Sequence, residues 1–175
     1  MSGCGPKRVT QQERPHPRVR APSRPGRGDV PSIQDYGYGA FFSSVDAVIV
    51  GRRTYDTVLG FPSWPYAGKR CVVLTHDPPP AQHTESFHTG DVASLLEQLH
   101  GEGVHHAYID GGVVIRSFLD ARVVNDLTIS VVPVILGNGV PLFQNGGVEQ
   151  RLRLVSSRAF ASGLVQITYQ CAGAT

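Results

Sequence analysis

The stretch Asp46-Ala47-Val48-Ile49-Val50-Gly51-Arg52-Arg53-Thr54-Tyr55 decides how this chain folds. Its apolar residues, most of them β-branched, predict a buried strand over 45–50 that breaks at Gly51, and residues 54–59 predict a helix. A strand that passes through glycine into a helix leaves unpaired backbone N–H groups and the positive end of the helix dipole at one point. With two arginines beside it, this point suits an anion, above all a phosphate. An ordinary turn with two solvated arginines would give the same pattern.

A second stretch repeats this design. Ile109-Asp110-Gly111-Gly112-Val113 follows an expected strand over 104–109 and opens an expected helix with apolar residues at helical spacing. Paired glycines let a backbone approach a ligand closely and offer several N–H groups. In one parallel sheet the two turns lie at the same edge, where together they can hold the phosphates of a dinucleotide. The G-x-G-x-x-G and G-x-x-x-x-G-K-[ST] motifs are absent, so this is neither a Rossmann nor a P-loop pattern.

The remaining pattern predicts an α/β domain. A short helix over 36–44 begins near Asp35, a strand covers 70–75, and an amphipathic helix begins at Asp91 and stops at Gly101 and Gly103. Strands then dominate, at 126–132, 134–136, 150–156 and 163–170. Strands that alternate with helices and then follow one another indicate a mostly parallel sheet, with helices on both faces and an antiparallel C-terminal edge.

Composition limits the class of protein. A chain of 175 residues is long enough for one domain with a substantial core. No apolar run approaches the ~18–20 residues that span a bilayer, and the start has no apolar signal region. Cys4, Cys71 and Cys171 are odd in number and lack C-x-x-C spacing, which favours reduced thiols in a cytoplasmic protein without a metal site.

Residues 1–31 differ from the rest of the chain. They hold six of the thirteen prolines and almost no large apolar residue, so we expect a disordered tail ahead of a domain over 32–175. Residues 1–28 contain seven Lys or Arg and one acid, which leaves nine basic and thirteen acidic residues, a net charge of −4, for 29–175. A basic tail is typical of nucleic-acid binders, and one hypothesis is binding through it. Because the tail has no aromatic residue or binding motif, an inert extension with neither a nucleic-acid nor a membrane partner is the preferred interpretation.

Three motifs in order resemble the dihydrofolate reductase-like superfamily. They are Gly51-Arg52-Arg53-Thr54-Tyr55 with Asp35-Tyr36-Gly37-Tyr38 before it, Tyr108-Ile109-Asp110-Gly111-Gly112, and residues 127–143. The closer match, over about residues 33–170, is the riboflavin-biosynthesis reductase branch, which is the C-terminal domain of the bifunctional deaminase-reductase and its stand-alone relatives. The deaminase zinc signature H-x-E…P-C-x-x-C is absent.

The resemblance implies the superfamily fold and an NADPH-dependent reductase that transfers hydride to a small heterocycle, as a homo-oligomer such as a homodimer. The substrate is then either an aminopyrimidine, as for 5-amino-6-(5-phosphoribosylamino)uracil reductase, or a pterin-like compound. By motif, the resemblance implies phosphate and 2′-phosphate binding by Gly51, Arg52, Arg53 and Thr54, an adenine ribose beside Thr75 and His76, and a pyrophosphate cradle of Gly111, Gly112, Val113 and Val114. For His76, a solvated loop histidine is an equal alternative.

A reductase also needs a proton source. Asp35, in the segment before the first predicted strand, is the candidate, because burial beside aromatic residues would favour its protonated form. A plain helix N-cap is the alternative role for it. Leu59, Phe61 and Trp64 are expected to wall the substrate side, or else to belong to the core or to an oligomer contact.

One element of the resembled family is missing from the pattern. Its members begin with an apolar strand and a motif like S-L-D-G-[FY]-I-A at the centre of the sheet, and residues 1–30 contain nothing of that kind. We therefore expect a gap at the centre of the sheet, with unpaired backbone groups beside it. The alternative to an active reductase is thus a catalytically inactive nucleotide-binding or scaffold protein of the same fold.

Overall fold

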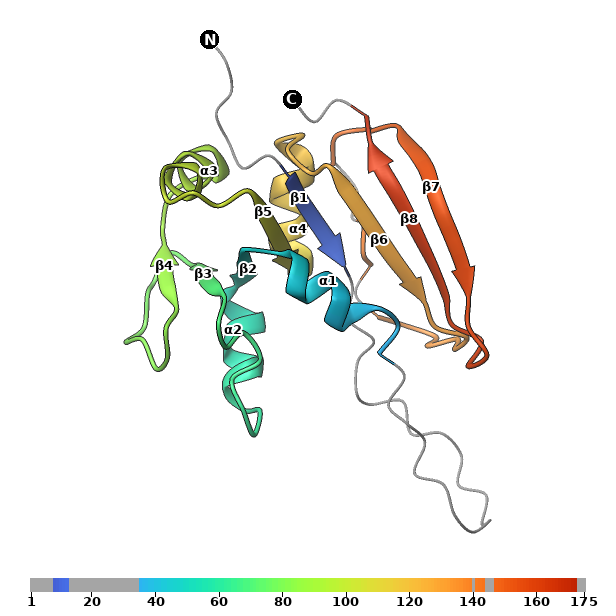
Figure 1. Cartoon of the computed structure of the whole chain (residues 1–175), viewed down its shortest axis with the longest axis horizontal. Coiled ribbons are helices and arrows are strands. Elements are labelled where there is room, and N and C mark those ends of the chain that lie inside the picture. The colour runs from blue at the N-terminus through green and yellow to red at the C-terminus, as the bar shows by residue number, and fades with distance from the viewer. Residues whose placement is uncertain (1–7, 13–34, 140, 144–146, 173–175) are drawn as a thin grey trace.

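A computed structural model describes residues 8–12, 35–139, 141–143 and 147–172 of the chain (Figure 1). The strands and helices follow one another as β1 (Arg8–Gln12), α1 (Tyr38–Ser44), β2 (Ala47–Gly51), α2 (Arg52–Leu59), β3 (Arg70–Leu74), β4 (Ser86–His88), α3 (Val92–Gly101), β5 (His106–Asp110), α4 (Gly112–Asp120), β6 (Asp126–Val131), β7 (Leu152–Ala159) and β8 (Val165–Cys171).

The eight strands form one sheet in the order β4-β3-β2-β5-β1-β6-β8-β7. The neighbours from β4 to β6 pair in parallel, whereas β8 pairs antiparallel with both β6 and β7. In Figure 1 the antiparallel strands form one end of the molecule. The predicted mostly parallel sheet with an antiparallel C-terminal edge is therefore confirmed.

The gap expected at the centre of the sheet is absent. β1 runs parallel between β5 and β6, where Thr10 lies beside Tyr108 on one side and Asp126 on the other. The prediction of a missing first strand is thus wrong at Arg8–Gln12. The sequence of this strand, RVTQQ, is polar and charged, so no hydrophobic pattern marks it. Residues 1–7 and 13–31, the rest of the predicted tail, lie outside the described residues, as do residues 32–34 of the predicted domain.

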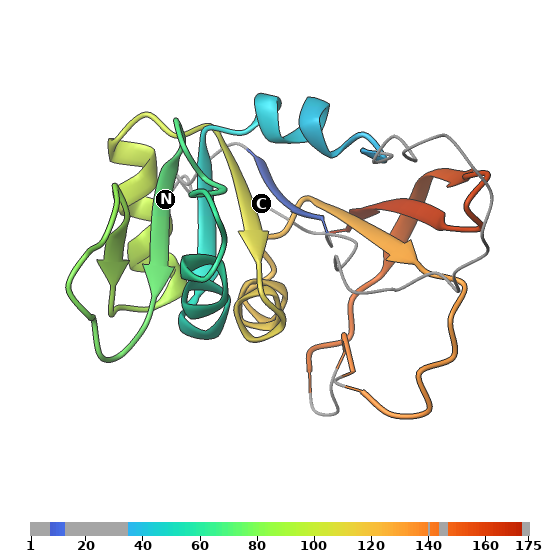
Figure 2. The ribbon, with the colours of Figure 1, turned by 90° about the horizontal axis from the view of Figure 1, so that it is seen from below.

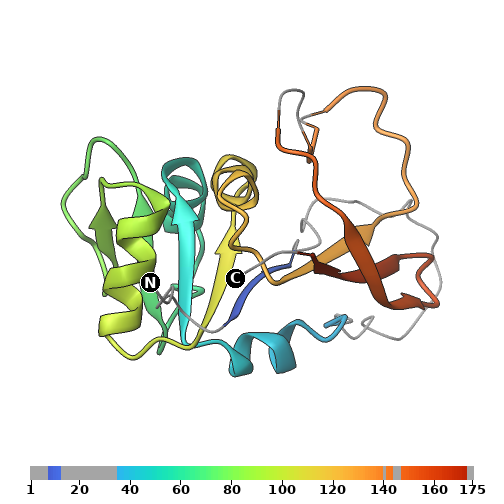
Figure 3. The same cartoon turned by 90° about the horizontal axis from the view of Figure 1, so that it is seen from above.

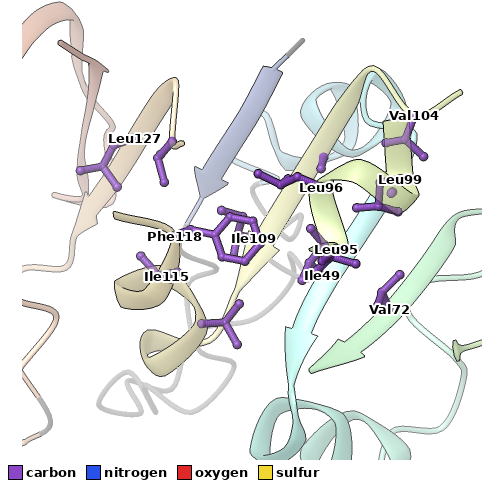
Figure 4. Close-up of a cluster of buried hydrophobic side chains, with 14 of the residues drawn as sticks. Ile49, Val72, Leu95, Leu96, Leu99, Val104, Ile109, Ile115, Phe118 and Leu127 are labelled. Atoms are coloured by element: carbon purple, nitrogen blue, oxygen red, sulfur yellow. The ribbon is translucent and has the colours of Figure 1, made fainter. Parts of the chain in front are cut away.

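The core lies on both faces of the parallel strands, because side chains alternate along each strand. In β2, Ala47 and Ile49 belong to one hydrophobic cluster, and Val48 and Val50 belong to the other. Figure 4 shows the first cluster, in which leucines of α3 and the apolar face of α4 cover the strands. The second cluster contains residues of α2, with aromatic side chains of α1 packed against it. Helices on both faces, as predicted, follow from this alternation.

Two further elements differ from the prediction. Residues 134–136 form no strand; the N–H of Val134 instead donates to the Val132 carbonyl at 2.8 Å, in a tight turn. β4 has only three residues and carries too little pattern to be recognised. None of the helices in the described part of the chain has the length and apolar character that crossing a bilayer requires.

Candidate nucleotide-binding cleft

A cleft of about 820 Å³ opens where the parallel strands β2, β3 and β5 end. Its size is within the range of small-molecule sites. Figures 2 and 3 show α2 and α4 side by side at the ends toward which β2 and β5 point. All ten residues of the predicted cofactor site line this cleft: Gly51, Arg52, Arg53, Thr54, Thr75, His76, Gly111, Gly112, Val113 and Val114.

The first glycine turn brings the start of α2 to the cleft. α2 begins directly after Gly51, and no side chain caps its N-terminus. Its first backbone N–H groups are therefore available to a ligand. A Cβ atom on Gly51 would lie 3.0 Å from Cγ2 of Val114, so α4 packs tightly against this turn.

The second glycine turn meets the first. Gly111 has a φ of +101°, and a Cβ atom on it would lie 2.7 Å from Oγ1 of Thr54. Both facts require glycine at this position. The next residue, Gly112, begins α4, which has no side-chain cap either, and a Cβ atom on Gly112 would meet only open space. The two turns predicted to converge are therefore direct neighbours, with two uncapped helix N-termini at one cleft.

The two arginines of the cleft, Arg52 and Arg53, differ in their hydrogen bonds and ion pairs. Nε of Arg52 donates to the Asp56 carboxylate at 2.8 Å, and its Nη1 donates to the Asp77 carbonyl at 2.9 Å. Arg53 is exposed, and its guanidinium has no ion pair or hydrogen bond within the described residues. Arg53 is therefore the freer cation, whereas Arg52 shares its charge with Asp56 and ties α2 to the loop after β3.

The residues after β3 form the next part of the wall. Thr75 accepts the backbone N–H of Asp77 on its hydroxyl at 3.2 Å, and its own N–H donates to the His88 carbonyl at 3.1 Å. These bonds fix the turn at which His76 stands exposed beside the cleft.

A third helix N-terminus, outside the predicted cofactor site, lines the cleft. The segment from β4 to α3 contributes His88, Thr89, Gly90, Asp91 and Val92. Here the helix is capped, because the Asp91 carboxylate accepts the N–H of Ser94 at 2.8 Å. Hydrogen bonding from Ser94 holds the pKa of Asp91 below its ordinary value. This end of the cleft is therefore negative, and the positions suited to an anion are the starts of α2 and α4.

The signal for this segment was present in the sequence. The sequence indicates that Asp91 is a helix cap, but a cap alone does not place a helix at a particular sheet edge. The placement follows from β4, which pairs in parallel with β3 and so ends at the same edge. Two other residues line the cleft, Ser117 on α4 and Pro141 in the segment after β6. No local sequence pattern predicts that either of them reaches the cleft.

Asp35 is not brought to the cleft. Its carboxylate is exposed and accepts the N–H of Gly39 at 2.9 Å and 3.1 Å, so it caps α1. Figures 2 and 3 show α1 at one end of the parallel strands and α2 and α4 at the opposite end. The expected burial of Asp35 is wrong, because the aromatic residues of α1 turn toward the sheet while the cap faces solvent.

Leu59, Phe61 and Trp64 do not line the cleft either. Leu59 and Trp64 pack against the second hydrophobic cluster. The indole of Trp64 stacks on His83 with ring centroids 4.5 Å apart, and Phe61 is 40% exposed. Within the described residues, no group of three or more His, Cys, Asp or Glu side chains is placed to hold a metal ion.

Residues 38–166 match the family defined by the RibD C-terminal domain. The chain belongs to this family. It is 34% identical to the uncharacterized protein YwjB of Bacillus subtilis over 138 residues, which are 77% of this chain and 79% of YwjB. The resemblance inferred from the three motifs is thereby confirmed.

Solved structures agree with the family assignment. A protein of Shewanella sp. PV-4 assigned to riboflavin biosynthesis superposes with a TM-score of 0.75 at 30% identity, covering 82% of this chain and 83% of its own. A deaminase/5-amino-6-(5-phosphoribosylamino)uracil reductase of Thermotoga maritima superposes with a TM-score of 0.62 at 16% identity, covering 96% of this chain and 57% of that larger one. The latter likeness concerns the fold alone. The expected fold class is confirmed.

Proposed function

We propose that this member of the RibD C-terminal family is an NADPH-dependent reductase that acts on a small heterocycle. One observation carries the proposal: two uncapped helix N-termini meet at Gly51 and Gly111 in a cleft that all ten predicted cofactor residues line. The N-termini of helices attract phosphate through their free N–H groups and dipoles. The family supports the reductase chemistry.

The cleft fits a dinucleotide in charge and shape. The pyrophosphate would lie between the starts of α2 and α4, where the open side of Gly112 leaves room for it. The adenosine end would lie toward Thr75 and His76, which line the side of the cleft formed by the residues after β3. Arg53, and Arg52 where it is not held by Asp56, would bind the 2′-phosphate and so favour NADPH over NADH.

The cofactor supplies the hydride, and the protein supplies binding and orientation. The apolar side chains of Val113, Val114 and Leu74 line the cleft, where they would exclude water from the bound ligand. Asp35 caps α1 away from this cleft, so the proton would come from water.

For the substrate, we propose an aminopyrimidine of the 5-amino-6-(5-phosphoribosylamino)uracil kind, with a pterin as the second candidate. The assignment of the Shewanella protein to riboflavin biosynthesis supports the first choice. The alternative of an inactive scaffold rested on a missing central strand, and β1 occupies that place.

We also propose that the protein is a cytoplasmic homo-oligomer. Cys71 and Cys171 are both buried and free, and burial raises the pKa of the Cys71 thiol to about 12. Such thiols suit a reducing compartment, because they neither pair nor react readily.

The test is a titration with NADPH followed by nicotinamide fluorescence, and then NADPH oxidation with a panel of aminopyrimidines and pterins. Gly112→Val should abolish cofactor binding while the protein stays folded, since its side chain would project into the open space of the cleft. Gly101→Val, at the far end of α3 where a Cβ atom also meets nothing, is the matched control. Equal binding by both variants would refute the proposed cofactor site.

A further inference from the structure

Arg52 and Asp56 form an ion pair within α2, about one helical turn apart. Nε of Arg52 donates to both oxygens of the Asp56 carboxylate, at 2.8 Å and 3.1 Å. Both side chains are partly exposed, at 41% and 50%. A cation at the first residue of a helix opposes the helix dipole, and a basic residue ahead of an acidic one is the weaker order for such a pair. The stability of α2 therefore does not account for Arg52.

A second hydrogen bond fixes the other end of the guanidinium. Nη1 of Arg52 donates to the Asp77 carbonyl at 2.9 Å. The turn at Asp77 is itself held, because the N–H of Asp77 donates to the hydroxyl of Thr75, which lines the cleft. Arg52 is thus anchored at two points beside the cleft. Its Nη2 and one N–H of Nη1 have no partner within the described residues.

The ion pair between Arg70 and Glu102 is built differently. Glu102 accepts Nε and Nη2 of Arg70 on separate oxygens, at 2.9 Å and 3.0 Å. This is the bidentate arrangement that makes arginine–carboxylate pairs strong. Asp56 accepts Nε of Arg52 alone, so its pair is the weaker of the two and a competing anion can break it.

The ion pair in α2 also affects the charge of the cleft. Among the described lining residues, Arg52 and Arg53 carry full positive charges and Asp91 carries a negative one. Asp56 does not line the cleft, but it neutralises one of the two cations that do. A phosphate monoester has about two negative charges near neutral pH and seeks the same N–H groups. Such a phosphate and the Asp56 carboxylate therefore compete for Arg52.

We infer that Asp56 determines cofactor specificity: by pairing with Arg52, it reduces the preference of the cleft for the phosphorylated cofactor. The inference rests on the proposed binding of NADPH. The 2′-phosphate must either take Arg52 from Asp56 or use only the N–H groups that Asp56 leaves free. Arg53 has no such competitor within the described residues. Asp56 is a positioning residue, since it acts through Arg52.

The test is the ratio of the NADPH and NADH dissociation constants, measured by nicotinamide fluorescence in the unmodified protein and in Asp56→Asn. Asparagine keeps an oxygen acceptor for Nε but removes the negative charge. NADPH should bind about two- to five-fold more tightly and NADH should not change, because only NADPH carries the 2′-phosphate. The gain should shrink at about 0.5 M salt, which screens exposed charges. An unchanged ratio, or weaker NADPH binding, would overturn the inference.

Asp120→Asn is the matched control. Asp120 pairs with Nε of Arg116 at 3.5 Å, at the same spacing on α4 and with similar exposure, but neither residue lines the cleft. The substitution makes the same change in net charge, so both affinities should stay as in the unmodified protein. A gain in NADPH binding as large as that of Asp56→Asn would assign the effect to net charge and refute the role of Asp56.

A second background separates the effect on Arg52 from a direct effect on phosphate. In an Arg52→Ala protein, Asp56→Asn should change the ratio less than it does in the unmodified protein, since no cation remains to be released. An equal gain in both backgrounds would refute positioning through Arg52. If the unmodified protein bound neither cofactor, the proposed function would fail and this inference with it, whereas cofactor binding with an unchanged ratio would remove the inference alone.

Discussion

The two ends of the sheet differ in how far their strands are buried. In β2, at the parallel end, four of five residues are fully buried between helices on both faces. In β7, at the antiparallel end, all eight residues are exposed. The parallel end is thus complete within one chain and positions the cleft, whereas the antiparallel end presents a surface that one chain does not cover. Stability and ligand binding should therefore depend on the first region, and association on the second.

The largest effect should come from the buried strand. Ile49→Ala removes a side chain with no exposure and should lower the free energy of unfolding by about 3–4 kcal/mol. Leu154→Ala, at a residue that is 56% exposed, should lower it by less than about 1 kcal/mol in dilute protein. Urea unfolding at two protein concentrations checks both values. A Leu154 effect that is large and independent of concentration would break the contrast between the two ends.

The next effect concerns the free cation of the cleft. Arg53→Ala should weaken NADPH binding by roughly 10–100-fold and NADH binding much less, because only NADPH carries the 2′-phosphate. Replacing Arg52 as well should widen this difference. Fluorescence titration with the two cofactors measures it, and equal losses for both would rule out the 2′-phosphate role.

A buried pair inside the parallel end gives a pH-dependent prediction. Tyr55 donates its hydroxyl to Glu85 at 2.6 Å, and the N–H groups of Gln82 and His83 donate to the same carboxylate. Burial alone would raise the pKa of Glu85, but these hydrogen bonds together hold it below its ordinary value. Burial, and then Glu85, raise the pKa of Tyr55 to about 12. The Glu85 carboxylate, held by the neutral Tyr55 hydroxyl and two backbone N–H groups, therefore stabilises the loop before β4.

Tyr55→Phe should accordingly lower the free energy of unfolding by about 1.5–3 kcal/mol at neutral pH. Because the pKa of Glu85 is lowered on folding, its stabilisation is present above the unfolded value of about 4.3 and is lost as the pH falls through the lower folded value. The difference between the variant and the unmodified protein should shrink over this window. Tyr36→Phe, which removes a surface bond to Ser162, is the control and should show no such dependence.

The smallest effect should come from the cap of α1. Asp35→Ala should lower the free energy of unfolding by about 1 kcal/mol, because the start of α1 loses its acceptor for Gly39. Turnover should change little, since Asp35 stands outside the cleft. If the pH profile of turnover lost its acidic limb in Asp35→Asn while stability was retained, Asp35 would instead be the proton source.

Much of the site could be recognised in the sequence because its signals are local. The strand, glycine and helix of each turn are neighbours in the chain, and the parallel sheet then brings Gly51 and Gly111 to one edge. The cap at Asp91 is equally local. The α/β class, the helices on both faces of the sheet and the two glycine turns therefore follow from patterns of a few residues each, and the resemblance to the family adds the other predicted cofactor residues.

Only the tertiary structure decided the rest. The polar segment Arg8–Gln12 becomes the central strand because β5 and β6 supply its hydrogen-bonding partners, which no pattern within the segment records. The same holds for the third helix at the cleft and for the exposure of Asp35. The apolar residues of 131–136 have the composition of a buried strand, and only the structure leaves them on the surface, because burial depends on what the rest of the fold places against a side chain.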